Sequence, residues 1–227
     1  MEDGLNIPVL FTFHGLEITL TAATAFGVTA VLGLVAWWAT RRRAMEPGTW
    51  QLLAEALVSV MEDAIAAAAP RHRKELLPFI GSLWVFLVVA NLTGLIPGLD
   101  SPTRDLSVTS ALAILVFFSV HWYGIRDQGL KGYLRHYLSP SPILLPFHLI
   151  SEVTRTVALA IRLFGNMMSL EMAALLVLVV AGFLAPVPLL MLHLVEALVQ
   201  AYIFGMLALI YVAGALQSQE LRKSHEE

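Results

Sequence analysis

The stretch Phe147–Gly182, FHLISEVTRTVALAIRLFGNMMSLEMAALLVLVVAG, decides the fold of this chain. It contains no proline and is rich in helix-forming residues, so we expect one helix of about 54 Å. The hydrocarbon core of a bilayer is about 30 Å thick. The helix therefore tilts steeply or projects beyond the membrane, and the ionisable groups along its length favour the tilt.

A second long apolar stretch, 189–219, follows a turn marked by Pro186 and Pro188. As one helix it would be about 46 Å long, which again exceeds the bilayer core. We expect 147–182 and 189–219 to form a long, strongly tilted hairpin within the membrane.

The composition places the whole chain in the membrane class. Hydrophobic residues make up 58% of it and charged residues only 14%, whereas soluble domains are about a quarter charged. We expect one membrane domain over residues 1–227. The net charge of -3 says nothing about nucleic acid, and no basic tail or patch points to it, so we expect no nucleic-acid partner. The absence of cysteine excludes disulfides and thiolate metal sites, and we expect no cofactor and no metal.

Three earlier uncharged stretches, at 18–40, 76–97 and 106–125, are each long enough to cross the bilayer. Between the first two, residues 50–69 repeat apolar side chains at helical spacing, which predicts an amphipathic helix at the membrane surface. The alternative is a helix packed on a soluble partner. The sequence thus predicts an all-α integral membrane protein with about five membrane helices and one interfacial helix.

Basic residues set the orientation. Most of the lysines and arginines fall in four clusters between and after the predicted spans, within 41–43, 71–74, 126–135 and 222–223. By the positive-inside rule these clusters are cytoplasmic. The N-terminus is then outside and the C-terminus is in the cytoplasm.

Polar residues on the first long helix form one stripe. Arg162, Asn166 and Ser169 are spaced i, i+4 and i+7, and Arg155 extends the same face. Glu171 lies about half a turn away from Arg162, so the two do not pair within the helix. An arginine at this depth is costly and keeps its charge, which favours a functional role.

The second long helix carries its own stripe of His193, Glu196 and Gln200, spaced i, i+3 and i+7. Together with Glu171, these groups suit a water-filled ion path, because carboxylates and histidine exchange protons or bind small cations. A guanidinium does not easily relay protons, but it attracts a carboxylate. This chain offers no obvious unassigned carboxylate at the same membrane depth as Arg162. A partner subunit is therefore expected to supply one.

Structural alternatives stay open for each of these residues. Arg162 could form an ion pair with Glu152 or Glu196, and His193 could be a hydrogen-bonded packing residue. Asn166 and Gln200 could bond one helix to another. Glu152 and Arg155 could anchor the cytoplasmic end of their helix. Asp105 precedes "LSVTS" and suits a helix N-cap or a place in the ion path.

Four segments resemble subunit a of F-type ATP synthases, the membrane stator that faces the rotating c-subunit ring. They are LAIRLFGNMMSLEM (Leu159–Met172), HLVEALVQAYIFGMLALIYV (His193–Val212), LLPFIGSLWVFLVVANLTGLIPG (Leu76–Gly98) and DLSVTSALAI (Asp105–Ile114). The resemblance covers most of the chain. The pairing of IRLFGN with a later QAYIF is specific to that family.

The resemblance implies a role for each residue. Arg162 would be the arginine that faces the c-ring carboxylate and separates two aqueous half-channels, with Asn166 and Gln200 beside it. Glu171 and His193 would belong to the half-channel open to the outside. Glu196 matches a carboxylate of many members, and Asp105 would lie near the channel mouth. Arg155 matches a basic position, although Thr156 stands where many members have proline.

The resemblance further implies a non-catalytic subunit in a bacterial inner membrane, which couples H⁺ or Na⁺ flow to ring rotation. Its partners would be the c-ring, b-type peripheral stalk subunits and lipid. A standalone channel or secondary transporter is one alternative, and it predicts ion flux from this chain alone. A haem-bearing redox subunit is another, with His121 and His193 as axial ligands.

Overall fold

The computed structural model describes residues 9–13, 16–41, 48–96, 99, 101–138, 145–181 and 187–226. Within these ranges, the side chains of residues 9–18, 128, 131, 134–138, 171, 181 and 217–226 are not described. The side chain of Glu171 therefore lies outside the described part of the chain.

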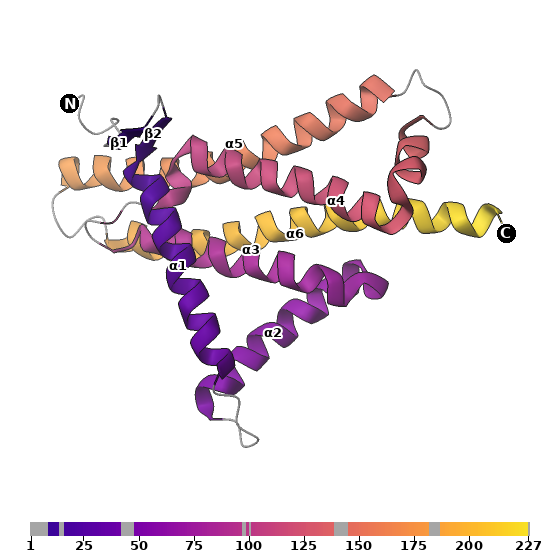
Figure 1. The fold of residues 1–227 in the computed structure, drawn as a ribbon. Helices are drawn as coiled ribbons and strands as arrows, with labels where there is room; N and C mark the ends of the chain where they lie inside the picture. The colour runs from indigo at the N-terminus through magenta and orange to yellow at the C-terminus, as the bar shows by residue number, and fades with distance from the viewer. Residues whose placement is uncertain are drawn as a thin grey trace.

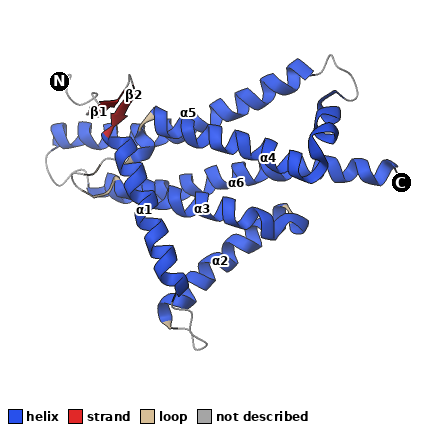
Figure 2. Ribbon diagram, in the orientation of Figure 1, coloured by secondary structure: helices blue, strands red, loops and turns tan. Residues whose placement is uncertain are grey.

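Helices make up nearly all of the described chain (Figure 2). They are α1 (Leu20–Arg41), α2 (Thr49–Ala68), α3 (Arg73–Thr93), α4 (Leu106–Leu138), α5 (Leu145–Ala181) and α6 (Val187–Glu226). Short 3-10 turns, η1 (Pro70–His72) and η2 (Pro102–Arg104), precede α3 and α4. Within the described residues, five stretches are long and apolar enough to span a membrane: Leu20–Arg41, Pro70–Thr93, Leu106–Asp127, Leu145–Val180 and Val187–Leu216. The predicted helical membrane fold with about five spans is confirmed.

A small β-hairpin before α1 was not predicted. Strands β1 (Val9–Phe13) and β2 (Leu16–Thr19) pair antiparallel, with Phe13 opposite Leu16. The signal was present in the sequence, because two runs rich in β-formers are separated by a two-residue His-Gly segment.

The helices form a bundle from which two of them diverge. In Figure 1, α3, α4 and α6 run side by side, and α5 packs against α4 and α6. Helix α1 contacts α3, η2 and α4 and then extends away from the bundle, while α2 returns toward the far end of α3. Helices α5 and α6, which carry the predicted polar residues, thus pack against α3 and α4 as well as against each other.

Helices α5 and α6 are nearly twice as long as the bilayer core is thick. Helix α5 has 37 residues and α6 has 40, which correspond to about 55 and 60 Å. Helix α4 changes direction at Gly129, whose φ of 73° is accessible to glycine without steric cost. The span ends just before this turn, and the sequence did not predict the helical continuation beyond it (Figure 1).

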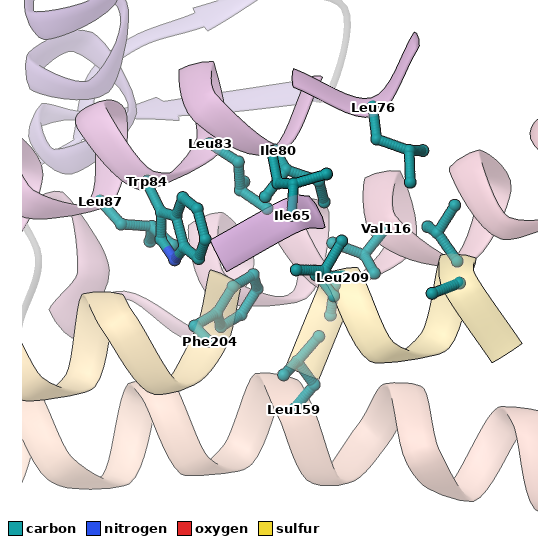
Figure 3. Close-up of a cluster of buried hydrophobic side chains, with 14 of the residues drawn as sticks. Ile65, Leu76, Ile80, Leu83, Trp84, Leu87, Val116, Leu159, Phe204 and Leu209 are labelled. Atoms are coloured by element: carbon teal, nitrogen blue, oxygen red, sulfur yellow. The ribbon is translucent and has the colours of Figure 1, made fainter. Parts of the chain in front are cut away.

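The core lies where α3 and α6 meet, with contributions from α2, α4 and α5 (Figure 3). On α3 the buried residues Leu76, Ile80, Leu83 and Leu87 follow the helical period. The buried face of α6 includes several alanines, which let helix backbones approach closely. This face carries Ala197, Ala201, Ala208 and Ala213.

Gly205 of α6 makes room for the largest core side chain. The indole of Trp84 occupies the space that a Cβ at this position would need. Trp84 also donates from Nε1 to the carbonyl oxygen of Tyr202 at 3.4 Å and stacks on its ring. The glycine therefore allows α3 and α6 to pack closely.

We expect Gly205→Ala to lower the free energy of unfolding by about 1–3 kcal/mol, because the added methyl overlaps the indole. Thermal denaturation of the purified protein in detergent measures the loss. Gly214→Ala on the same helix is the matched control, since a Cβ there meets nothing within 4 Å. Equal melting temperatures for the two variants would contradict this account.

The predicted interfacial helix is present as α2, and its apolar stripe divides into two parts. Leu53, Leu57 and Val60 are exposed, whereas Ile65 is fully buried and Ala68 packs on the core. The first half of α2 therefore presents apolar side chains outward, as expected of a helix at a membrane surface.

Candidate functional site

Arg162 lies on an exposed face of α5. Its side chain is exposed between apolar neighbours such as Ile161, which is 56% exposed. Among the described side chains it makes no ion pair, so the alternative pairing with Glu152 or Glu196 is not present there. Only 12% of the α5 span is buried, against 50% of the α6 span. The fixed charge therefore lies on an exposed face of α5, the less buried of the two long helices.

One turn along from Arg162, a hydrogen bond joins α5 to α6. Asn166 Nδ2 donates to Gln200 Oε1 at 2.7 Å. Gln200 is only 1% exposed, and its Nε2 is buried without a hydrogen-bond partner among the described residues. The two amides therefore bond α5 to α6, which was the structural alternative for Asn166 and Gln200. Gln200 Nε2 is left as a buried donor on α6.

His193 lies two turns before Gln200 on α6 and is 7% exposed. Its Nε2 is also buried without a described partner. The ring lies beside Gly94, where a Cβ would be 3.7 Å from His193 Cε1. Glu196, between His193 and Gln200 on the same stripe, is half-buried.

These two unpaired nitrogen atoms indicate a polar interior. Leaving a buried donor or acceptor unpaired costs about 1–3 kcal/mol. Native proteins avoid that cost with ordered water, which makes two to four hydrogen bonds to such groups. Water at His193 Nε2 and Gln200 Nε2 would remove this cost.

Asp105 forms the N-cap of α4 and holds α1 in place. Its Oδ1 accepts from Ser107 N at 2.9 Å and from Ser107 Oγ at 2.7 Å, which is the predicted cap. Its Oδ2 accepts from the hydroxyls of Thr21 and Thr19. Burial raises the pKa of this carboxyl, but the bonds from Thr21, Ser107 and Thr19 outweigh burial, so the pKa lies below its ordinary value of 3.8. Both oxygens are thus occupied, and the geometry favours the cap over a relay role.

Sequence reasoning missed Asn91, which is fully buried at the end of α3. Its Nδ2 donates to Ala197 O of α6 at 3.0 Å, and its Oδ1 accepts from Thr103 Oγ1 at 2.8 Å. Because a carbonyl only accepts, the amide nitrogen must face Ala197 and the amide oxygen must face Thr103. Thr103 Oγ1 also contacts Ser101 Oγ at 2.7 Å, and Ser101 Oγ donates to Ala90 O at 2.9 Å. Through the bond from Asn91 to Ala197, this network holds α6 in place at the residue that follows Glu196.

The signal for this network was a polar residue inside an otherwise apolar run, "VVANLTG". We expect Thr103→Val to lower the free energy of unfolding by about 1–3 kcal/mol, because Asn91 Oδ1 loses its donor in a buried site. Thermal melting in detergent checks this loss. Thr103→Ser keeps the hydroxyl and should melt closer to the native protein. A serine variant as unstable as the valine variant would count against the hydrogen bond.

The remaining predicted residues lie apart from this cluster. Glu152 of α5 faces His121 of α4, with 3.4 Å between Oε2 and Nε2. Arg155 lies over the ring of Tyr211, with Cζ 4.7 Å from its centroid. Ser169 is exposed. The structure thus brings Asn166 and Gln200 together and separates both from Glu152 and Arg155.

The two histidines of the haem alternative do not face each other. His121 is bonded to its own helix, with Nδ1 2.8 Å from Phe117 O, and pairs with Glu152. His193 lies beside Gly94 at the end of α3. Axial ligands must flank one iron from opposite sides, so this arrangement gives the haem alternative no support.

Comparison with known proteins identifies the family of this chain. Residues 22–213 match the family described as ATP synthase A chain. ATP synthase subunit a 1 of Hahella chejuensis is 64% identical over 96% of this chain and 92% of its own length. ATP synthase subunit a 2 of Pelobacter propionicus is 60% identical over 96% of each chain. ATP synthase subunit a of Legionella pneumophila is 52% identical over 99% of this chain and 98% of its own. With five apolar spans and this similarity, the chain is a multi-pass membrane protein that belongs to the ATP synthase subunit a family.

Proposed function

We propose that this chain is the ion-translocating stator of an F-type ATP synthase and couples H⁺ or Na⁺ flow to rotation of a c-subunit ring. The observation that carries the proposal is the exposed Arg162 on the open face of α5, beside buried nitrogen atoms of α6 that lack described partners. A fixed cation next to a hydrated interior suits a moving carboxylate on another protein.

The half-channel open to the outside follows the α6 stripe. An ion enters past His193 and Glu196, with Glu171 on α5 as a further member, and reaches the level of Gln200. There it neutralises a ring carboxylate, which can then move into lipid. Neutralisation is necessary because a charge at the bilayer centre costs at least about 2.5 kcal/mol.

After nearly a full turn of the ring, the carboxylate releases its ion on the cytoplasmic side. Arg162 then attracts the ionised carboxylate and prevents a direct leak between the two half-channels. Asn166 and Gln200, which bond to each other, hold α5 and α6 together at this level. The transmembrane potential supplies about 2.3 kcal/mol per charge per 100 mV, which gives the rotation its direction.

We assign Asp105 to docking α1 rather than to ion relay, because both of its oxygens already accept hydrogen bonds. The N-terminus would lie outside and the C-terminus in the cytoplasm of a bacterial cell. The exposed apolar surfaces of α1, α5 and α6 would contact lipid, the c-ring and b-type stalk subunits. The chain has no catalytic role of its own in this scheme, and ATP chemistry belongs to the rest of the complex.

The test is coupled proton pumping by the assembled complex after Arg162 is replaced by alanine. Loss of pumping with normal assembly supports the proposal, and retained pumping rejects it. Ion flux through the purified chain without its complex would favour the standalone channel instead.

A further inference from the structure

A second polar cluster lies in a cavity between α4, α5 and α6, away from the α6 stripe. The cavity has a volume of about 20 Å³, which is room for one water molecule. Its polar lining comes from all three helices, and its ionisable side chains are His121, Glu152, Arg155 and Tyr211. The ring of Tyr133 also approaches His121, at 5.9 Å between centroids.

Hydrogen bonding fixes the protonation of His121. Its Nδ1 lies 2.8 Å from Phe117 O, and a carbonyl only accepts, so Nδ1 carries hydrogen. Its other nitrogen, Nε2, lies 3.4 Å from Glu152 Oε2. With no proton between them, a lone pair would face a carboxylate oxygen. One proton shared by the pair, as imidazolium and carboxylate or as imidazole and carboxylic acid, removes that repulsion.

The position of the cavity along the helices is significant. Glu152 precedes Arg162 by ten residues on α5, which is about 15 Å. His121 lies five residues before Arg126. Arg126 begins the basic cluster that we propose faces the cytoplasm. The cavity therefore lies between Arg162 and the cytoplasmic end of the helices. Arg155, held over the Tyr211 ring, supplies a fixed charge at its wall.

We infer that His121 and Glu152 form a proton-binding site that carries protons between the ring and the cytoplasm. This inference rests on the proposed function and commits it to H⁺. During synthesis the pair gives its shared proton to cytoplasmic water, the ring carboxylic acid loses one proton to water, and that water passes one proton back to the pair. The pair is unchanged after each cycle. During ATP-driven pumping the same steps run in reverse.

The experiment measures passive proton flux through the complex in vesicles stripped of the catalytic sector, driven by a potassium diffusion potential over a range of pH. We expect Glu152→Gln to lower the flux at least about tenfold and to flatten its pH profile, since the amide cannot bind the proton. Glu152→Asp should retain most of the flux. Glu55→Gln on the exposed surface of α2 is the matched control.

Chemical rescue separates proton transfer from packing. We expect His121→Ala to lower the flux and added imidazole to restore part of it, which a purely structural role would not allow. Co-purification with the c-ring shows that each variant is assembled. Native flux and pH profile in both Glu152→Gln and His121→Gln would overturn the inference, as would flux that depends on Na⁺ and not on pH. If Arg162→Ala still abolishes coupling in those complexes, the proposed function survives and only this site is lost.

Discussion

Replacing Arg162 by alanine is expected to abolish coupled ATP synthesis and ATP-driven proton pumping. Without the guanidinium, the ionised ring carboxylate at this level has no counter-charge in a low-dielectric site. That cost is at least about 2.5–3.5 kcal/mol, or about a hundredfold or more in rate. The measurement is fluorescence quenching by inverted membrane vesicles on addition of ATP, with the amount of assembled complex determined in parallel.

Arg162→Lys should also fail. Lysine is a compact, strongly hydrated charge that loses its proton when it is desolvated, whereas the planar guanidinium stays ionised. Lys74→Ala is the charge control, because Lys74 is exposed at the start of α3 and far along the chain from α5. Pumping at the native rate in the alanine variant would remove Arg162 from the mechanism.

Asp105→Ala is expected to produce the largest loss of stability. The change removes a carboxylate that accepts four hydrogen bonds. The fully buried Thr21 hydroxyl then loses the carboxylate oxygen to which it donates. Bonds to a charged group contribute about 1.5–3 kcal/mol each, so the loss of several of them should exceed the losses expected for the other stability variants. Thermal denaturation in detergent should show the loss, together with easier proteolysis of α1.

The contribution of Asp105 should depend on pH in one direction. Its pKa in the folded protein lies below its ordinary value of 3.8, so the stabilisation is complete above that value and is lost as the pH falls through the folded pKa. The stability difference between the native protein and Asp105→Asn should therefore be constant near neutral pH and shrink below about pH 4. Asp63→Asn, an exposed carboxylate on α2, should show no such trend. A pH-independent difference would mean that the carboxylate charge plays no part.

Hydropathy alone predicted the membrane helices because a chain in lipid must satisfy its own backbone hydrogen bonds, and helices of about 20 apolar residues do so. Periodicity also placed Arg162 with Asn166, and His193 with Gln200, on common faces. The β1–β2 hairpin was missed although its pattern was present. The turn of α4 at Gly129 was missed because the charged, polar stretch after residue 125 gives no hydropathy signal for a further helix.

Contacts between helices were decided only by the tertiary structure. The sequence left Asn166 and Gln200 as separate candidates, and the structure bonds them at 2.7 Å. The sequence left Glu152 as one possible partner for Arg162, and the structure pairs Glu152 with His121. The physical reason is geometric: one residue of register rotates a helix face by about 100°, and only packing against neighbouring helices fixes that rotation. The sequence determined which side chains could act, and the packing of α3, α4, α5 and α6 determined which of them meet.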